Sequence, residues 1–425
     1  MRSLITAFLI VAVAGCGGQP EGTEDVTAAA TPGRSTDILL QAFHWQSHQG
    51  GNNGRNWYQE IAAQAQTISN AGFTHAWFPP PSDSAAPQGY LPRRLNRLDS
   101  AYGSENNLRS AISALSSRGV RSVADIVVNH RVGTNSWADF SEPTWPGYYV
   151  ASTDEWDGAK SINGDTGADF HAARDLDHVN PALRNDIVNW MNNRLESVGF
   201  TGWRFDFVRG YGGSYVGEYA RRTSPNFCVG ELWNDFFLSD NGNGHRQDLM
   251  NWIDATGGRC AAFDFTTKGL LNQVLRNGDY WRLRDSSGGP SGAIGWWPSN
   301  SVTFVDNHDT GPSRSCGEGQ NHWPVPCGAV MEGYAYILTH PGIPTVYWAH
   351  YFNWNLRNQI NALMAVRRGQ GLNSESSVNI VAAENGLYAA FIDGNTAMKI
   401  GWRNWSPGGG WTLRTSGNNY AVWTR

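Results

Sequence analysis

Short apolar runs alternate along the chain with segments in which apolar residues recur every three or four positions. The first pattern is typical of buried strands and the second of amphipathic helices. Strands are expected at residues 38–43, 72–78, 120–128, 200–207, 227–232, 261–265, 302–305 and 345–348. Clear helical patterns lie at residues 57–71, 107–118, 181–198 and 329–339. Repeated strand–helix units require a parallel sheet, and eight of them predict an α/β fold of the (β/α)8 TIM-barrel type.

Two segments depart from this rhythm. Residues 131–180 are rich in Gly, Asp and Trp and weakly periodic, and are expected to form an insertion after the third strand. A loop of that length is usually functional. From about residue 369 the pattern changes to short strand-like runs, which predict an antiparallel β-domain over 369–425. The barrel is then expected over 37–130 and 181–368.

The first residues have the pattern of an export signal. A short basic start precedes an apolar run over 4–14, which is too short to span a bilayer. Val13-Ala14-Gly15-Cys16 resembles the lipobox of bacterial lipoproteins, with an ordinary signal peptide as the alternative. We expect a signal over 1–16 and a disordered linker over 17–36. The protein would be secreted or held on the bacterial surface, with membrane contact only through Cys16.

Four further cysteines lie in the expected barrel. An even number in an exported chain permits two disulfides, and the sequence allows three pairings. Cys316 and Cys327 flank a loop with Gly and Pro, while Cys228 and Cys260 each precede a strand-like run. The pairings Cys228–Cys260 and Cys316–Cys327 are therefore favoured, with free buried thiols as the alternative.

The composition narrows the range of possible binding partners. The 425 residues carry 32 Lys and Arg against 37 Asp and Glu, for a formal net charge of -5. No basic run stands out, which argues against nucleic acid as a partner. Most of the 20 Trp are expected in the core, although a Trp face also suits a sugar ring. The oligomeric state cannot be read from the sequence, and a monomer is the default expectation.

Polar side chains end four of the predicted strands. The strand ends contain Asn129-His130, Arg204 and Asp206, Glu231, and Asp306-Asn307-His308-Asp309. A single Asp at such a place often caps the next helix. Because the carboxyl ends of barrel strands meet at one face, four such ends predict a shared cleft.

Carboxyl groups in one cleft suit the hydrolysis of a glycosidic bond. One carboxylic acid protonates the leaving oxygen while a second carboxylate attacks the anomeric carbon. The acid needs a raised pKa, and the nucleophile needs a cation nearby. Arg204 lies two residues before Asp206 on a strand, points to the same side, and can supply that charge.

These four strand ends resemble the short motifs of the α-amylase family of glycoside hydrolases. Longer runs, such as Gly202-Trp-Arg-Phe-Asp-Phe and Ile294-Gly-Trp-Trp-Pro, are similar to plant α-amylases. Phe227-Cys-Val-Gly-Glu-Leu-Trp resembles bacterial maltotetraose-forming amylases. Many family members have Lys-His where this chain has Arg209-Gly210, but both similar groups also have Gly at the second position. The resemblance runs from about residue 37 to the end.

The resemblance implies a retaining enzyme with three acidic residues in the cleft. Asp206 would be the nucleophile, Glu231 the general acid/base, and Asp309 a third carboxylate that holds the sugar at the cleavage point. The other residues implied to bind or orient there are Arg204, His130, His308 and Tyr90. The adjacent Trp296 and Trp297 would form a surface site for starch granules, with one buried and one exposed Trp as the alternative.

The resemblance also implies calcium, which takes oxygen ligands from carboxylates and backbone carbonyls. A first site would use Asn129, Asp165, Asp175 and the carbonyls of Ala168 and Gly210. A second would use Asp154, Asp169, Asp175 and the carbonyls of Phe170 and Ala173. Taken without the resemblance, spaced Asp residues in a loop favour turns and solubility.

Three functions remain open from the sequence. The first is an endo-acting α-amylase that cuts α-1,4 bonds in starch, glycogen and maltooligosaccharides. The second is an exo-acting amylase that releases a fixed maltooligosaccharide. The third is a non-catalytic starch-binding surface protein, which would be expected to have a damaged carboxylate trio. The balance between hydrolysis and transglycosylation has no signal in the sequence.

Overall fold

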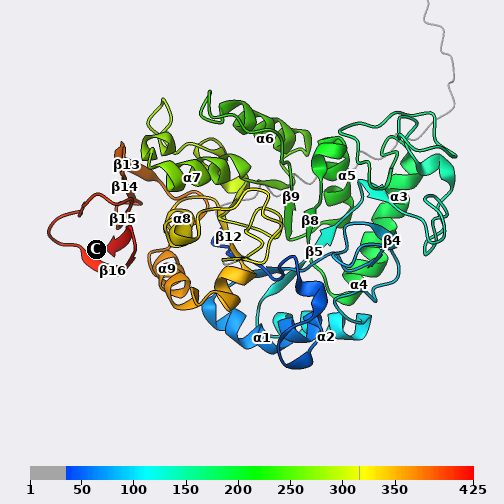
Figure 1. Ribbon diagram of the computed structural model, residues 1–425, viewed down its shortest axis with the longest axis horizontal. Helices are drawn as coiled ribbons and strands as arrows, with labels where there is room; N and C mark the ends of the chain where they lie inside the picture. The colour runs from blue at the N-terminus through cyan, green and yellow to red at the C-terminus, as the bar shows by residue number, and fades with distance from the viewer. Residues whose placement is uncertain (1–34, 315) are drawn as a thin grey trace, which may run out of the picture.

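A closed barrel of parallel strands forms the centre of the molecule (Figure 1). The computed structural model describes residues 35–314 and 316–425. The barrel strands are β1 Leu39–Gln41, β2 His75–Trp77, β5 Arg121–Ile126, β8 Gly202–Phe205, β9 Phe227–Gly230, β10 Ala261–Phe263, β11 Ser301–Phe304 and β12 Ile343–Tyr347. β1 pairs with both β2 and β12, which closes the barrel. The predicted barrel fold is confirmed, whereas the predicted signal, Cys16 and nearly all of the linker lie outside the described residues.

Helices follow most of these strands. They are α1 Trp57–Ala71, α2 Glu105–Ser116, α3 Pro181–Trp190 with its continuation to α4 Glu196–Val198, α5 Gly213–Thr223, α6 Asn243–Ala255, α7 Phe265–Asn277, α8 Val330–Thr339 and α9 Arg357–Gly369. α1 has the predicted bounds because Asn56 caps its first turn and Gly72, with a φ of 92°, ends it. Phe265, expected in a strand, instead begins α7, where Asp264 caps the helix by accepting from the Thr267 N–H.

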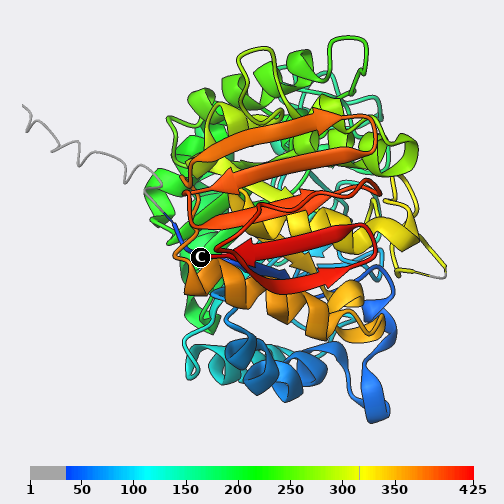
Figure 2. The same cartoon turned by 90° about the vertical axis from the view of Figure 1, so that its left-hand side faces the viewer.

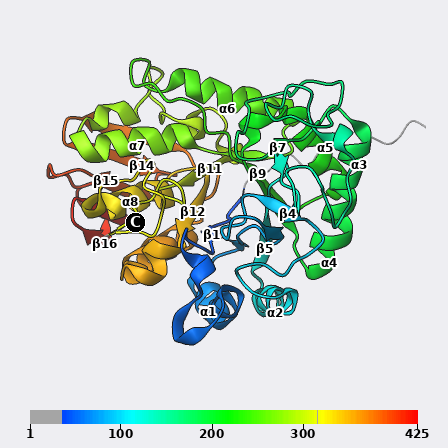
Figure 3. The ribbon, with the colours of Figure 1, turned by 45° about the vertical axis from the view of Figure 1, so that its right-hand side comes forward.

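The segment after β5 forms a lobe of loops. It begins with β6 His130–Arg131, which pairs antiparallel with β7 Arg174–Asp175. Figures 1 and 3 show this lobe on the side of the barrel away from the C-terminal sheet. A smaller hairpin of β3 Asp83–Ser84 and β4 Pro92–Arg94 follows β2. Both extensions lie beyond the carboxyl ends of their strands, where they border the polar strand ends.

The last part of the chain is a five-stranded antiparallel sheet. Its strands are β13 Val378–Glu384, β14 Leu387–Ile392, β15 Thr396–Ile400, β16 Thr412–Gly417 and β17 Tyr420–Thr424. One face packs on α8 and α9, and Figure 2 shows the other face toward the viewer. The predicted β-domain is confirmed. β16 escaped prediction because its sequence, Thr-Leu-Arg-Thr-Ser-Gly, is mostly exposed and polar.

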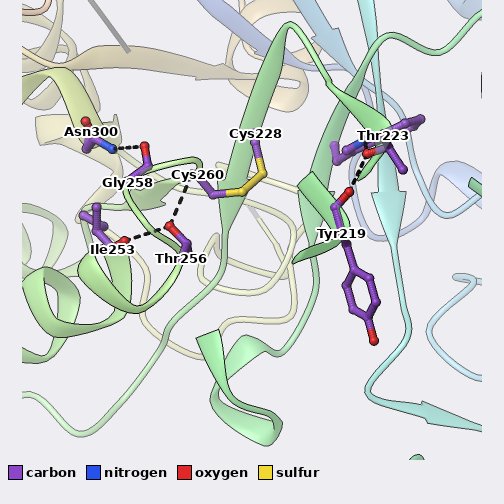
Figure 4. The surroundings of a disulfide bond; sticks show 9 residues. Tyr219, Thr223, Cys228, Ile253, Thr256, Gly258, Cys260 and Asn300 are labelled. Atoms are coloured by element: carbon purple, nitrogen blue, oxygen red, sulfur yellow. Dashed lines mark hydrogen bonds between the residues drawn. A yellow bond between two sulfur atoms is a disulfide. The ribbon is translucent and has the colours of Figure 1, made fainter. Parts of the chain in front are cut away.

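Two disulfides join neighbouring parts of the chain, and both favoured pairings are confirmed. Cys228 of β9 bonds to Cys260, directly before β10, with 4.6 Å between their Cα atoms (Figure 4). Cys316 bonds to Cys327 and closes the loop after β11. Each helix of the described part is too short or too polar to cross a bilayer.

Candidate active site

Arg204 lies at the centre of the polar strand ends. Its Nη1 donates to Asp125 Oδ1 and to Asp206 Oδ1, each over 2.7 Å. Its Nη2 lies 2.7 Å from Glu231 Oε1. The guanidinium is fully buried, with its Cζ 4.9 Å from the centre of the Trp77 ring. One cation thus contacts a carboxylate on β5 and two that directly follow β8 and β9.

The three carboxylates around Arg204 share too little positive charge for all of them to ionise easily. Burial, opposed by Arg204, raises the pKa of Asp125, Asp206 and Glu231. Neighbouring carboxylates add to the rise for each of them. Arg204 makes an aligned hydrogen bond to Asp206, whereas Glu231 Oε1 has no hydrogen-bond partner among the described residues. The pKa is about 8 for Glu231 and about 7 for Asp206, so a proton shared within this coupled group resides more on Glu231 than on Asp206.

Asp309 lies in the loop after β11 and is held from two sides. The Gln320 amide donates to its Oδ1. The Nε2 of His308 lies 3.2 Å from its Oδ2. Because Gln41 Nε2 lies 2.8 Å from His308 Nδ1, the amide can donate there and leave the His308 proton on Nε2, facing Asp309. Burial lowers the pKa of His308 to about 4, so this ring is neutral.

An aromatic wall, made of Tyr90, His308 and Trp45, borders the carboxylates. The Tyr90 ring stacks on His308, with 5.2 Å between centroids, and on Trp45 at 6.2 Å. The Tyr90 hydroxyl donates to Asp125 Oδ2 over 3.0 Å. The family resemblance implied that Tyr90 binds the sugar at the cleavage point. In the structure its half-buried ring lies beside His308 and the buried carboxylates.

His130 lies behind this wall. Its Nε2 donates to the Tyr90 carbonyl over 2.8 Å, and its Nδ1 lies 3.3 Å from the Asn129 amide nitrogen. One face of the ring stacks on Phe170 with 3.7 Å between centroids. Burial lowers the pKa of His130 to about 4. Both ring nitrogens are thus engaged within the protein, which positions Tyr90 rather than leaving a donor free for a sugar.

Several residues of this site had no role assigned from the sequence. Asp125 binds Arg204, Tyr90 and, through Oδ2, the Trp77 indole N–H at 3.0 Å. Its place on an inward-facing strand position was the signal that could have found it. Gln320 and Trp45 lie in aperiodic loops, where nothing local indicates what they contact.

A second acidic group lies where the insertion meets the barrel. Carboxylate oxygens of Asp165, Asp169 and Asp175 lie within 4.8 Å of one another. Burial and the neighbouring acids raise the pKa of Asp165 to about 6 and that of Asp175 to about 7. Asp165 Oδ2 is buried without a hydrogen-bond partner among the described residues. Such an oxygen-only cluster, lacking its own cation, fits a hard metal ion.

The barrel side of this cluster has the other expected donors. The Asn129 amide donates to Asp175 Oδ1 over 3.1 Å, and its Oδ1 faces Gly210. A Cβ at Gly210 would lie 2.0 Å from that oxygen, so only glycine fits. The Ala168 N–H bonds to the Arg209 carbonyl. The structure thus brings the residues of the first expected set, Asn129, Asp165, Ala168, Asp175 and Gly210, to one seam.

The second expected set is less complete. Asp154 is buried and paired with Arg174, whose Nε donates to Asp154 Oδ1 over 2.8 Å. Its Oδ2 accepts from the Asp175 N–H. Its carboxylate neighbours are Glu155 and Asp175, whereas Asp169 groups with Asp165. The Phe170 carbonyl accepts from the Ala173 N–H. Asp154 therefore already has a cation supplied by the chain itself.

The two adjacent tryptophans differ in exposure. Trp296 is 46% exposed, and the Arg246 guanidinium lies 3.8 Å over one of its faces. Trp297 is half-buried against the core. The structure therefore presents one open indole face at this place, backed by a cation.

Comparisons with known proteins agree with this geometry. The profile of the α-amylase catalytic domain matches residues 47–231, and that of the α-amylase C-terminal β-sheet domain matches residues 369–424. The chain is 45% identical to probable α-amylase 2 of Arabidopsis thaliana, over 91% of this chain and 94% of the relative. It is 33% identical to glucan 1,4-α-maltotetraohydrolase of Stutzerimonas stutzeri, over 83% of this chain and 65% of that protein.

A solved structure shares the fold. The α-amylase from Geobacillus thermoleovorans, complexed with acarbose, aligns with a TM-score of 0.63 over 86% of both chains. Its sequence identity is only 16%, so this match supports the architecture and nothing finer.

Proposed function

The chain belongs to the α-amylase family of glycoside hydrolases, and from this we propose that it is an endo-acting, retaining α-amylase. Its substrates would be the α-1,4-linked glucans starch, glycogen and maltooligosaccharides. The observation that carries the proposal is the position of Arg204, which touches Asp206 and Glu231 at once. An acid that keeps its proton beside a carboxylate that stays charged is what glycosidic cleavage with retention requires.

In this mechanism Glu231 donates its proton to the glycosidic oxygen as the bond breaks. Asp206 attacks the anomeric carbon and forms a covalent glycosyl-enzyme, and the aglycone leaves with the proton. Glu231, now a carboxylate, then takes a proton from water, which attacks the same carbon and releases Asp206. Asp309, held by Gln320 and His308, would bind the hydroxyls of the sugar at the cleavage point.

We further propose a structural calcium ion at the seam between insertion and barrel. Asn129, Asp165, Asp175 and the carbonyls of Ala168 and Gly210 would hold it. Calcium there would neutralise the clustered carboxylates and would take no part in bond cleavage. The unpartnered Asp165 oxygen and the glycine required at position 210 support this assignment. The second expected site is a weaker fit, because Arg174 already neutralises Asp154.

Export from the cell is also proposed. Two disulfides suit an oxidising compartment. Lipid attachment at Cys16 and the monomeric state stay predictions from the sequence.

An exo-acting enzyme is the second candidate. It is favoured by the similarity to two bacterial proteins named glucan 1,4-α-maltotetraohydrolase. Starch digestion followed by iodine colour and by new reducing ends separates the two. Rapid colour loss with few new ends indicates internal cuts. Slow colour loss with many new ends indicates attack from chain ends and contradicts the endo proposal. No change in either signal would leave only the starch-binding protein.

A further inference from the structure

Another exposed tryptophan, Trp281, lies at the edge of a hollow in the segment between α7 and β11. Trp281 belongs to the short 3₁₀ helix Tyr280–Leu283, which packs against β13, and is 48% exposed. The hollow has a volume of about 620 Å³. It is lined by Trp281, Arg284, Asp285, Ser286, Ser287, Gly288 and Ile380. It thus lies between a barrel loop and the first strand of the C-terminal sheet.

The Trp281 ring is held in place from behind. The Arg282 guanidinium lies 4.3 Å over one face of the indole. Arg282 is fixed in turn, because its Nε donates to Asp279 Oδ2 over 2.9 Å and its Nη1 to the Leu238 carbonyl. One indole face is therefore covered by a tethered cation, and the other is left for solvent or a ligand. Trp296 has the same construction, with Arg246 as its backing.

The floor of the hollow is also rigid. Asp285 Oδ1 accepts from the backbone N–H groups of Ser287 and Gly289, each over 3.0 Å. Asp285 Oδ2 accepts from Arg246 Nη1 over 3.1 Å. Because Arg246 also lies over the Trp296 ring, the loop that lines the hollow is linked through Arg246 to Trp296. Arg246 and the backbone N–H groups compensate the negative charge of Asp285. The hollow therefore attracts a cation only weakly.

The remaining polar groups are donors and acceptors open to a neutral ligand. Arg284 is exposed, and its guanidinium makes no hydrogen bond or ion pair to any described residue. Ser286 and Ser287 are exposed beside it. The Ser287 hydroxyl donates to Asp285 Oδ1 over 2.8 Å, so its oxygen can still accept from a ligand, while the Arg284 guanidinium can donate. A fixed aromatic face next to such acceptor and donor groups matches a sugar ring, which has an apolar face and a polar edge.

We propose that this hollow is a glucan-binding site outside the cleft. A glucose unit of an α-glucan stacks on the open face of Trp281, and its hydroxyls bond to Arg284 and Ser287. The site holds the enzyme on polymeric substrate while other chain segments occupy the cleft. This inference rests on the proposed function for the identity of the sugar.

Retardation in a native gel that contains amylopectin tests the site. All variants are made in the Glu231→Gln background, so that the polymer is not digested. Trp281→Ala is expected to weaken binding to amylopectin by about fivefold or more, as the loss of one aromatic stacking contact of 1 kcal/mol or so predicts. Arg284→Ala, whose exposed side chain contributes no packing, is expected to weaken binding by about twofold.

Trp402→Ala is the matched control. Trp402 is 56% exposed and lies near Tyr280, but it does not line the hollow. The Trp402→Ala variant should migrate like the parent Glu231→Gln protein. Unchanged retardation of both Trp281→Ala and Arg284→Ala would overturn the site, as would an equal loss in Trp402→Ala.

Hydrolysis of maltoheptaose by the unmodified protein separates this inference from the proposed function. If maltoheptaose is cleaved and the Trp281 variant binds amylopectin normally, only the surface site is wrong. If maltoheptaose is not cleaved, the enzyme proposal fails whatever the gel shows.

Discussion

The molecule contains two crowded groups of carboxylates that are balanced in different ways. At the candidate active site, called the cleft below, Arg204 contacts Asp125, Asp206 and Glu231, so the chain supplies the compensating cation itself. At the insertion seam, Asp165, Asp169 and Asp175 lie together, and none of them pairs with a Lys or Arg among the described residues. An internal cation holds the carboxylates around Arg204 in fixed places, whereas the proposed metal site at the seam would take its cation from outside.

This difference suits the two proposed roles, which are catalysis around Arg204 and metal binding at the seam. A buried guanidinium makes directional hydrogen bonds and leaves one carboxyl protonated, which acid–base chemistry needs. An external metal ion can draw oxygen donors from two parts of the chain into one joint. Asp154 lies between these cases, because it belongs to the insertion but is neutralised by Arg174. The comparison therefore predicts different consequences of changing each group.

The largest effect is expected in the cleft. Glu231→Gln should lower kcat by about 100- to 10,000-fold, because the leaving oxygen loses its proton donor. Asp206→Asn should lower kcat at least as much. The melting temperature of both variants should stay close to that of the parent, since each removes a carboxylate from a group with surplus negative charge. Initial rates on maltoheptaose and thermal unfolding measure the two quantities. A variant that loses activity only in proportion to lost folded protein would contradict these roles.

For Asp154, the intermediate case, loss of the internal cation should lower the free energy of unfolding. Arg174→Met leaves the buried Asp154 carboxylate without its partner, which costs about 3–5 kcal/mol of unfolding free energy. Added calcium should recover part of this loss, because Asp154 then joins Glu155 and Asp175 as a free oxygen donor. Urea unfolding with and without calcium measures both effects. Arg94→Met removes one of two half-buried partners of Asp83, which keeps its ion pair with Arg93, and serves as the control, with an expected cost below about 1 kcal/mol. Equal losses in the two variants would refute the internal-cation argument.

Removal of calcium should have a smaller effect. A chelator is expected to lower the unfolding free energy by about 3 kcal/mol when calcium was present at 100 times its dissociation constant. Asp165→Asn should be less stable than the parent in calcium and should respond less to the chelator, because a ligand is already lost. Asp206→Asn should respond like the parent. If the chelator changed the stability of none of these proteins, the seam would not be a calcium site.

The contrast also shows which features of the molecule could be predicted from the sequence. The barrel was predictable because its strands are short, apolar and separated by helical patterns, and the cleft followed from polar groups at four strand ends. The Arg174–Asp154 pair was not predictable, since its members lie 20 positions apart in an aperiodic loop and only the fold joins them. Gln320 reaches Asp309 for the same reason. α7 lacked a clear helical signal because it is buried on most of its positions.

The smallest effect is expected in the pH profile, and it separates the two groups most sharply. Burial and neighbouring carboxylates raise the pKa of Glu231 to about 8. Because the acid must be protonated to act, kcat/KM should fall tenfold for each pH unit above that value. The pKa reported by this limb belongs to the coupled cleft group as a whole. Calcium should not move the limb, since Glu231 is balanced by Arg204 and not by the metal. Rates on maltoheptaose at two calcium concentrations test this, provided that the protein stays folded. A limb that shifts to lower pH with more calcium would place the titrating group at the seam, because bound calcium favours the ionised carboxylate. The division between internally and externally balanced acids would then be wrong.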